Sequence, residues 1–309
     1  MSGAYTHLAV ANEASASVRN LALRDSTKRA LRKYLAFVEL GAVSPDYPYL
    51  GLKRQQSKWA DAMHYTSTAT LIRNAVSEVR AQPASKQEKL TAWLLGMASH
   101  IATDMTIHPV VELKVGMYEQ NQAGHRICEM HQDAYIFPRR MNVGETAYSE
   151  HIKTGLGACG DKADPEKLDP DIASLWTRVL HTTYPSLGET TPADPHAWHS
   201  GFRVVLGTMA SASRLVPFAR HVAATAGLSY PLAAEVDEQY THRLRTPEGS
   251  IDFDQLFDRA RDNVTEMWCG LDRALSGADI DALEKLEDWN LDTGRSLVTG
   301  RLVFWIGEA

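Results

Sequence analysis

Hydrophobic residues recur at helical spacing along most of this chain, and the alternation typical of strands is rare. Leu31, Leu35 and Val38, for example, fall on one face of a helix. The same periodicity predicts helices over residues 4–23, 27–40, 59–80, 123–137, 172–181, 197–225, 253–275 and 280–286. Only residues 302–306 resemble a short strand, so the pattern predicts an all-α fold.

The most apolar helix is expected to follow Pro83 and to extend to about residue 107. Ser85 and Glu88 have the spacing of a capping box at its start. Pro109 is expected to stop or kink it, because proline lacks an N–H and clashes with the preceding turn. Residues 41–49 contain two prolines and are expected to form a loop.

Between residues 144 and 169 the composition shifts to Gly, Asp and Lys, which indicates a long surface loop or a seam. We therefore expect residues 1–143 to form a helical core that holds the candidate metal ligands described below. Residues 144–309 are expected to form a second helical portion packed on this core, the two together making one globular unit.

Composition narrows the functional classes. The chain has 309 residues, of which 44 % are hydrophobic, and a formal net charge of -6. It offers no basic stripe, so we expect no binding of duplex nucleic acid. Its three cysteines (Cys128, Cys159 and Cys269) are widely spaced, which excludes a disulfide framework and a cysteine zinc knuckle. No signal peptide and no apolar stretch of about 18 residues is evident, so the expected location is cytoplasmic, without a transmembrane segment.

Candidate chemistry is concentrated on the apolar helix, where His100, Asp104 and His108 follow one another at intervals of four residues. Residues at this spacing lie along one face of a helix, drifting by about 40° per step. Two histidines alone could be core residues bonded to backbone carbonyls. A buried aspartate between them is costly unless it is paired or binds a metal, so the stripe favours a metal site.

A second pair, His125 and Glu129, repeats the four-residue spacing on the next helix. His131 and Asp133 are rival ligands there, although helical geometry turns them away from the His125 face. His64, Asp46 and His7 add ligand-type side chains from other elements, and each taken alone is as compatible with a structural role.

Eight imidazole and carboxylate ligands without a thiolate suit catalytic zinc, and they exceed what one ion needs. Two or three ions are expected, and close-set metals are suited to phosphoester hydrolysis. The same ligand types also accept iron or manganese.

The order His7, Asp46, His64, His100-x3-Asp104, His108 and His125-x3-Glu129 resembles the zinc-dependent phospholipase C family, which shares its helical bundle with the fungal single-strand-specific zinc nucleases. Residues 290–294, Asn-Leu-Asp-Thr-Gly, also resemble a segment of bacterial members. The resemblance implies a trinuclear zinc site on a phospholipase C-like bundle with a helical C-terminal extension.

Carried over residue by residue, the resemblance implies a first zinc on Asp46, His64, His100 and Asp104. A second would lie on His108, His125 and Glu129, and a third on His7, with Asp104 bridging it to the first. A metal-bound hydroxide would attack phosphorus, with Asp46 as base or water-orienting group.

Two further expectations follow from the resemblance. Tyr47 and Tyr49 are candidates for the substrate pocket. In the family a processed N-terminal Trp completes the third site, and no Trp precedes His7 here, so occupancy of that site is left open.

Three functions remain open at this point. The first is a zinc-dependent phosphoesterase acting on a lipid or a smaller phosphate ester. The second is a metallohydrolase or metal-dependent biosynthetic enzyme with a substrate that is neither a lipid nor necessarily a phosphate, since a fold does not fix a substrate. The third is a non-catalytic metal-binding or membrane-docking module. The sequence does not indicate an oligomeric state.

Overall fold

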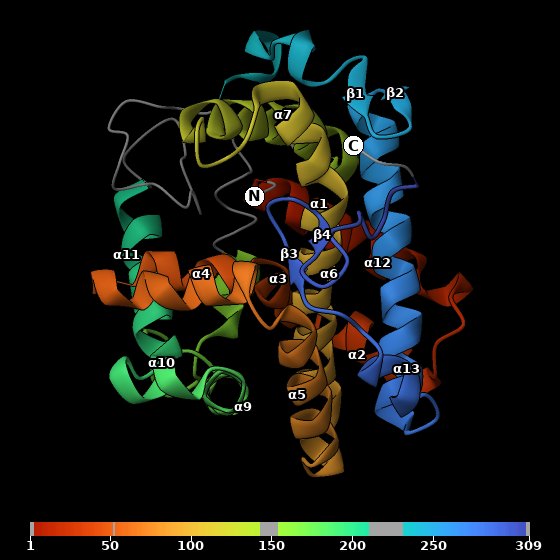
Figure 1. Ribbon diagram of the computed structural model, residues 1–309. Helices are drawn as coiled ribbons and strands as arrows, with labels where there is room; N and C mark the ends of the chain where they lie inside the picture. The colour runs from red at the N-terminus through yellow and green to blue at the C-terminus, as the bar shows by residue number, and fades with distance from the viewer. Residues whose placement is uncertain (1–2, 52, 143–153, 210–230, 307–309) are drawn as a thin grey trace.

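The computed structural model describes residues 3–51, 53–142, 154–209 and 231–306, and it confirms the all-α class. The central element is α6 (Ala84–Val115), a long helix that runs through the middle of the molecule (Figure 1). Every residue of α6 from Leu90 to Val111 is buried. A helix that is enclosed on all sides cannot show one apolar stripe, which explains its nearly continuous hydrophobic sequence.

The helices that surround α6 come from both halves of the chain. The first half supplies α1 (Ala4–Ala16), α2 (Asp25–Lys33), α3 (Leu35–Val43), α4 (Ser57–Tyr65), α5 (Thr68–Arg80) and α7 (Gln122–Met141). The second half supplies α9 (Pro170–Thr183), α10 (Pro185–Thr190), α11 (Pro195–Met209), α12 (Phe253–Ser276) and α13 (Ile280–Glu284). Helices α3 and α12 make the most extensive contacts with α6. The division into two portions at residue 144 stays a prediction.

Short elements complete the described chain. They are the 3-10 helices η1 (Ser17–Asn20), η2 (Ser44–Leu50), η3 (Arg54–Gln56), η5 (Leu156–Cys159), η6 (Ala233–Glu235) and η7 (Glu238–Tyr240). Two antiparallel hairpins pair β1 (Leu244–Thr246) with β2 (Gly249–Ile251) and β3 (Trp289–Asn290) with β4 (Arg295–Ser296). Within the described residues, no helix combines the length and apolar character that crossing a bilayer requires.

Several predicted helices are divided in the structure. The helix expected over residues 4–23 ends at Ala16 and gives way to η1. The one expected over 27–40 breaks at Tyr34, whose backbone leaves the helical region (φ -118°, ψ 38°). The one expected over 59–80 breaks at Ser67, which adopts a left-handed conformation (φ 50°). Periodicity does not detect such breaks at Tyr34 and Ser67, because the apolar face resumes after one or two non-helical residues.

Three local predictions were wrong, and Pro109, expected to stop or kink the apolar helix, does not stop it. The apolar helix passes through Pro109 and ends only at Val115. Its N-cap is Pro83, and Ser85 makes no capping hydrogen bond. The loop expected over residues 41–49 is helical, since α3 extends to Val43 and η2 follows directly. Residues 302–306 form no strand; only Leu302 makes an isolated bridge, to Arg295.

The remaining helices lie close to their predicted ranges, as α7, α9, α12 and α13 show. The helix expected over residues 197–225 starts at Pro195 and is described to Met209; residues 210–230 lie outside the described chain. Of the region predicted as loop or seam, residues 144–153 also lie outside it.

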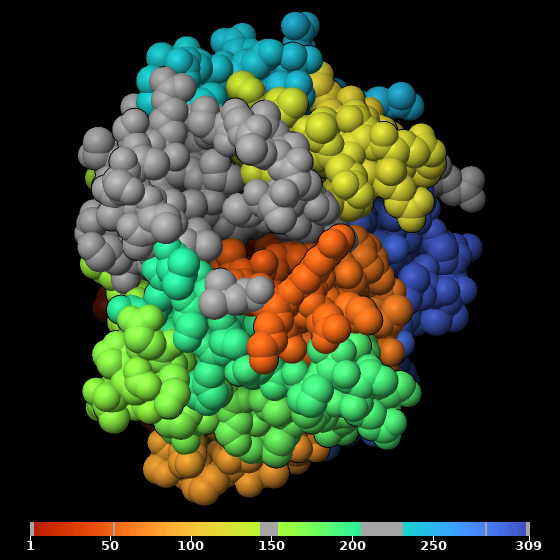
Figure 2. Space-filling model, turned by 90° about the vertical axis from the view of Figure 1, so that its left-hand side faces the viewer, coloured from red at the N-terminus to blue at the C-terminus, as the bar shows by residue number. Residues whose placement is uncertain are grey.

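One side of the molecule places α11 against η2 and the start of α4. The indole N–H of Trp198 donates to Gln56 (2.8 Å), and that of Trp59 donates to the carbonyl of Thr191 (3.0 Å). Figure 2 shows this face, with the green surface of α10 and α11 beside the orange surface of η3 and α4. Since η2 carries Asp46, residues far along the chain support a candidate ligand.

Candidate metal centre

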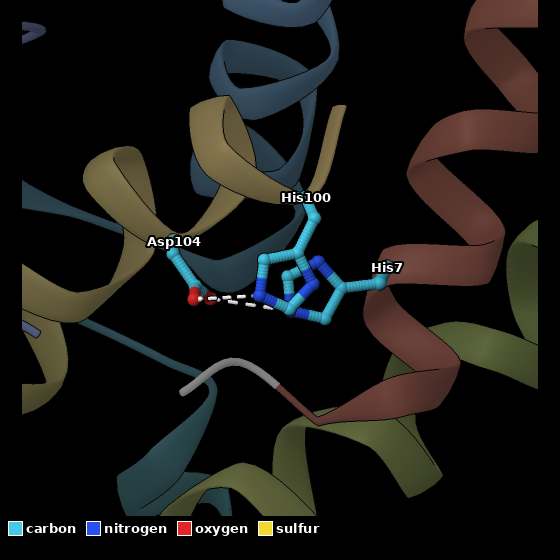
Figure 3. A group of neighbouring side chains, drawn as sticks. All are labelled: His7, His100 and Asp104. Carbon is cyan, nitrogen blue, oxygen red and sulfur yellow. Dashed lines mark ion pairs between the residues drawn. The ribbon is translucent and has the colours of Figure 1, made fainter. Parts of the chain in front are cut away.

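Asp104 is the centre of the candidate site. Its Oδ1 lies 3.1 Å from His7 Nε2 and 3.2 Å from His108 Nε2. Its Oδ2 lies 3.1 Å from His100 Nε2 and 3.8 Å from His64 Nε2. Figure 3 shows how His7 approaches from α1 while His100 and Asp104 project from the same stretch of α6. The spacing of four residues along α6 therefore places imidazoles at both oxygens of one carboxylate.

Asp46 joins the same cluster from η2. Its Oδ1 lies 3.4 Å from His64 Nε2, and the Nε2 atoms of His64 and His100 are 3.3 Å apart. Two groups have donor atoms all within 4.8 Å of one another: His7, His100 and Asp104, and Asp46, His64 and His100. We call these five residues the inner cluster. Every one of them is buried.

Backbone carbonyls orient two of these imidazoles. His64 Nδ1 bonds the carbonyl of Ala60 (2.7 Å), and His100 Nδ1 bonds that of Ala42 (2.9 Å). A donor hydrogen on Nδ1 leaves Nε2 unprotonated, which is the tautomer that a metal requires. The contact to Ala42 depends on close packing of α3 on α6, because a side chain at Gly41 or Gly96 would overlap the other helix's backbone.

The rings themselves are tightly packed. His7 and His100 stack with centroids 4.0 Å apart and planes inclined by 10°. The helix start that carries His7 is held by Asp133, which accepts from the Thr6 backbone N–H (2.8 Å) and from its hydroxyl (2.6 Å). Asp133, a rival ligand by sequence, therefore contacts the start of α1.

Several polar atoms of the inner cluster have no hydrogen-bond partner among the described residues. These include both ring nitrogens of His7 and Oδ1 of Asp46, and His108 Nε2 shares the property. Buried polar atoms are normally satisfied, so such a concentration needs an explanation. Ligands of one tetrahedral zinc ion lie about 3.3 Å apart, which is close to the N···O separations observed here. The donor set therefore fits a metal.

The electrostatics of Asp104, Asp46 and His7 agree with this assignment, whereas the carboxylates of Asp104 and Asp46 outweigh burial and raise the pKa of His100. Burial would raise the pKa of Asp104, but the imidazoles of His108, His100 and His7 outweigh it and hold that pKa well below its usual range. The pKa of Asp46 is also lowered, since its close contact with His64 and the charge of His100 outweigh burial. Burial lowers the pKa of His7 to about 4. Ionised carboxylates and a neutral imidazole are the forms that bind metals.

The other expected ligands, His108, His125 and Glu129, are here called the outer group. His108 touches the inner cluster through Asp104. His125 Nε2 instead bonds the carbonyl of Gly116 (2.6 Å), and Glu129 is half-buried, with a pKa that burial raises to about 7. The described structure does not bring these three donors together as it does the inner cluster, and their role stays a prediction.

The hydroxyl groups of the two candidate pocket tyrosines contact side chains of neighbouring helices. The Tyr47 hydroxyl lies 2.8 Å from His199 Nδ1 in a buried contact, and Tyr49 donates to Asp61 (2.7 Å). Tyr47 is fully buried, whereas Tyr49 is half-buried. Their contribution to a substrate pocket stays a prediction.

Sequence reasoning assigned no role to two residues beside the ligands. Asp292 Oδ1 lies 3.8 Å from His108 Nδ1, and the Asp292 carboxylate also accepts from the Tyr65 hydroxyl (2.7 Å). His199 contacts η2, the element that carries Asp46, through the hydroxyl of Tyr47. The resemblance of residues 290–294 to bacterial members was a signal for Asp292, whereas the local Asp-Pro-His-Ala-Trp-His sequence does not indicate the contact of His199 with Tyr47.

Comparison with known proteins bears on this arrangement. A family model described as zinc-dependent phospholipase C matches residues 6–185, which is more than half of the chain and includes all eight candidate ligands. No curated protein and no solved structure matches the chain. With the helical architecture and the buried His and Asp groups, this match establishes that the chain belongs to the zinc-dependent phospholipase C family.

Proposed function

We propose that this protein is a zinc-dependent phosphoric ester hydrolase that cleaves a phosphodiester bond as a phospholipase C does. The observation that supports this most is the inner cluster, in which buried carboxylates and imidazoles converge at the separations that a tetrahedral ion requires. The family match supports zinc as the metal and a lipid phosphoester as the substrate class. Zinc rather than iron or manganese, and a cytoplasmic location, remain predictions.

Asp104 is proposed as the bridging ligand, because its two oxygens face different imidazoles. Oδ2 would serve a first ion together with Asp46, His64 and His100. Oδ1 would serve an ion at His7, and the outer group would hold one further ion. Zinc bound there would supply Lewis acidity toward phosphoryl oxygens and lower the pKa of water.

The protein's own groups have separate tasks in this proposal. His64 and His100 present Nε2 in a fixed orientation, because the carbonyls of Ala60 and Ala42 hold the opposite nitrogens. Asp46 has a lowered pKa, so it is ionised at neutral pH and can orient the attacking water or accept its proton. Burial of these groups excludes bulk water and strengthens each of these electrostatic effects.

The test is hydrolysis by zinc-loaded protein of a panel of phospholipids and water-soluble phosphodiesters. We expect a phosphorylated head group and diacylglycerol from a lipid, and no phosphatidic acid. The Asp104→Asn variant, loaded in the same way, is expected to be inactive. Folded, zinc-loaded protein that hydrolyses no phosphate ester would reject the proposal, and turnover of a phosphate-free substrate would redirect it to another metallohydrolase.

A further inference from the structure

The C-terminal segment exposes apolar side chains to solvent. Val298 is 73 % exposed, Leu297 50 % and Val303 39 %, and Ile306 follows at 85 %. Most other large apolar side chains of the described residues are buried, so this concentration within ten residues is unusual. We call residues 295–303 the apolar loop.

Backbone hydrogen bonds give the apolar loop a defined shape. The N–H of Ser296 donates to the carbonyl of Arg301 (2.9 Å), and that of Gly300 donates back to Ser296 (2.9 Å). Leu297 and Val298 therefore lie at the tip of a closed turn. Exposed apolar residues on an ordered tip are typical of a surface that meets an apolar partner.

The charges of this segment favour an anionic partner. Residues 293–306 contain Arg295 and Arg301 and no acidic residue, although the whole chain carries a formal net charge of -6. Arg295 donates to the carbonyl of Gly300 (2.8 Å), which fixes it at the base of the turn, whereas Arg301 is exposed. An arginine beside exposed apolar side chains matches the phosphates and acyl chains of a lipid surface.

The residues just before the apolar loop contact the candidate metal centre. The Leu291 N–H donates to the carbonyl of His64 (2.9 Å), and Asp292 lies beside His108. Gly294, with φ +65°, packs directly on the carbonyl of Met105, where a side chain would not fit. Figure 1 shows β3 and β4 in front of α6, the helix that carries His100, Asp104 and His108.

We propose that the apolar loop docks the protein on a phospholipid bilayer, with Leu297 and Val298 entering the head-group region and Arg301 facing lipid phosphates. This inference rests on the proposed function, because a lipid phosphodiester is delivered from such a surface. It adds the surface of the protein that faces the lipid.

The experiment measures sedimentation of the zinc-loaded full chain with vesicles of phosphatidylcholine and phosphatidylglycerol. The variant Leu297→Ser/Val298→Ser is expected to bind at least about tenfold more weakly than wild type. Arg301→Gln is expected to weaken binding to these vesicles and not to pure phosphatidylcholine. Leu232→Ser, a matched change of an exposed apolar residue near η6, is expected to bind like wild type.

Hydrolysis of a water-soluble phosphodiester, measured on the same variants, separates docking from catalysis and is expected to be unchanged. Wild type that stays in the supernatant, or equal binding of the loop variant and wild type, would overturn the docking inference. So would light scattering that shows a loop-dependent dimer with unchanged vesicle binding, since a second copy of the chain would then cover the loop. Loop-dependent binding without any phosphodiester hydrolysis would support docking and reject the proposed function.

Discussion

The inner cluster and the outer group contain the same ligand types, yet the structure prepares them to different degrees. In the inner cluster, Nε2 of His64 and His100 already faces a carboxylate, because backbone carbonyls hold the opposite nitrogens. In the outer group, the carbonyl of Gly116 holds Nε2 of His125 and leaves Nδ1 for a metal, but the donors of His125 and Glu129 are not among those that the described residues bring together. A preorganised ligand set loses less free energy on binding, so we expect the ion at Asp46, His64, His100 and Asp104 to be held more tightly than the ion of the outer group.

The largest expected effect comes from Asp104→Asn. This change removes the negative charge of the carboxylate whose two oxygens face His7 and His100. Elemental mass spectrometry should therefore show the loss of more than one zinc per chain. Hydrolysis should fall by more than roughly 10–100-fold, which is the loss typical of replacing a residue that only hydrogen-bonds a metal ligand. Asp272→Asn is the control: Asp272 is equally buried but bonds Arg24 and Thr27, so its loss should lower stability and leave zinc content unchanged. Full zinc content in Asp104→Asn would show that the cluster is polar packing.

A chelator titration sharpens the comparison between the two groups. His100→Ala should abolish the ion that wild type releases last, whereas His125→Ala should abolish only the one that it releases first. We expect the two ions to differ in affinity by about tenfold or more, the order by which oriented ligands outperform unoriented ones. Simultaneous release of all ions from wild type, at one chelator concentration, would remove the distinction drawn here.

Glu129→Gln tests the outer group without metal. Burial raises the pKa of Glu129 from 4.5 to about 7, so the folded state favours the neutral carboxyl. The metal-free protein should therefore lose stability as pH rises from about 4.5 to about 7, where the unfolded chain is ionised and the folded one resists ionisation. Removing that carboxyl should stabilise the metal-free protein by about 1 kcal/mol at pH 8 and change little at pH 4.

Urea unfolding in the presence of a chelator measures this difference. With zinc bound, the sign should reverse at pH 8, because the carboxylate then has a cation beside it. Equal stabilities of variant and wild type at both pH values, without metal, would show that Glu129 is not in a desolvated setting.

The part of the candidate site that could be predicted from the sequence is the arrangement of side chains along one helix. The stripe from His100 to His108 needs only the geometry of one helix, and the structure retains it even though Pro109 fails to stop that helix. The helix continues past this proline although Pro109 cannot donate to the carbonyl of Met105, and a neighbouring buried carbonyl finds another partner. Trp305, for instance, donates to the carbonyl of Thr106 (3.0 Å).

The parts that could not be predicted depend on contacts between distant segments. The resemblance of residues 290–294 singles out Asp292, but it does not show that this residue lies beside His108, because that contact joins positions more than half of the chain apart. Likewise, the break at Ser67 follows from a left-handed backbone conformation, which the presence of a serine does not predict. Tertiary packing decided both features, and periodicity reports only on the face that each segment buries.

The smallest expected effect concerns Tyr47, which follows Asp46 directly and bonds His199. Helix α11 packs so closely on η2, which contains Tyr47, that a side chain at Gly201 would overlap the carbonyl of Leu50. Tyr47→Phe keeps the packing but removes the hydrogen bond, so Asp46 should be held less firmly. We expect zinc binding by the inner cluster to weaken by less than about tenfold.

Two variants decide whether His199 positions Asp46 or merely fills space. His199→Gln retains a side chain that can accept from the Tyr47 hydroxyl, so it should bind zinc nearly as wild type does, whereas His199→Phe should match Tyr47→Phe. Tyr135→Phe, which removes a hydroxyl bonded to Asp254 (2.6 Å) on another helix, should leave the affinity unchanged. If His199→Gln and His199→Phe weaken zinc binding equally, the hydrogen bond is irrelevant. The orientation of the ligands in the inner cluster would then rest on the backbone contacts of His64 and His100 alone.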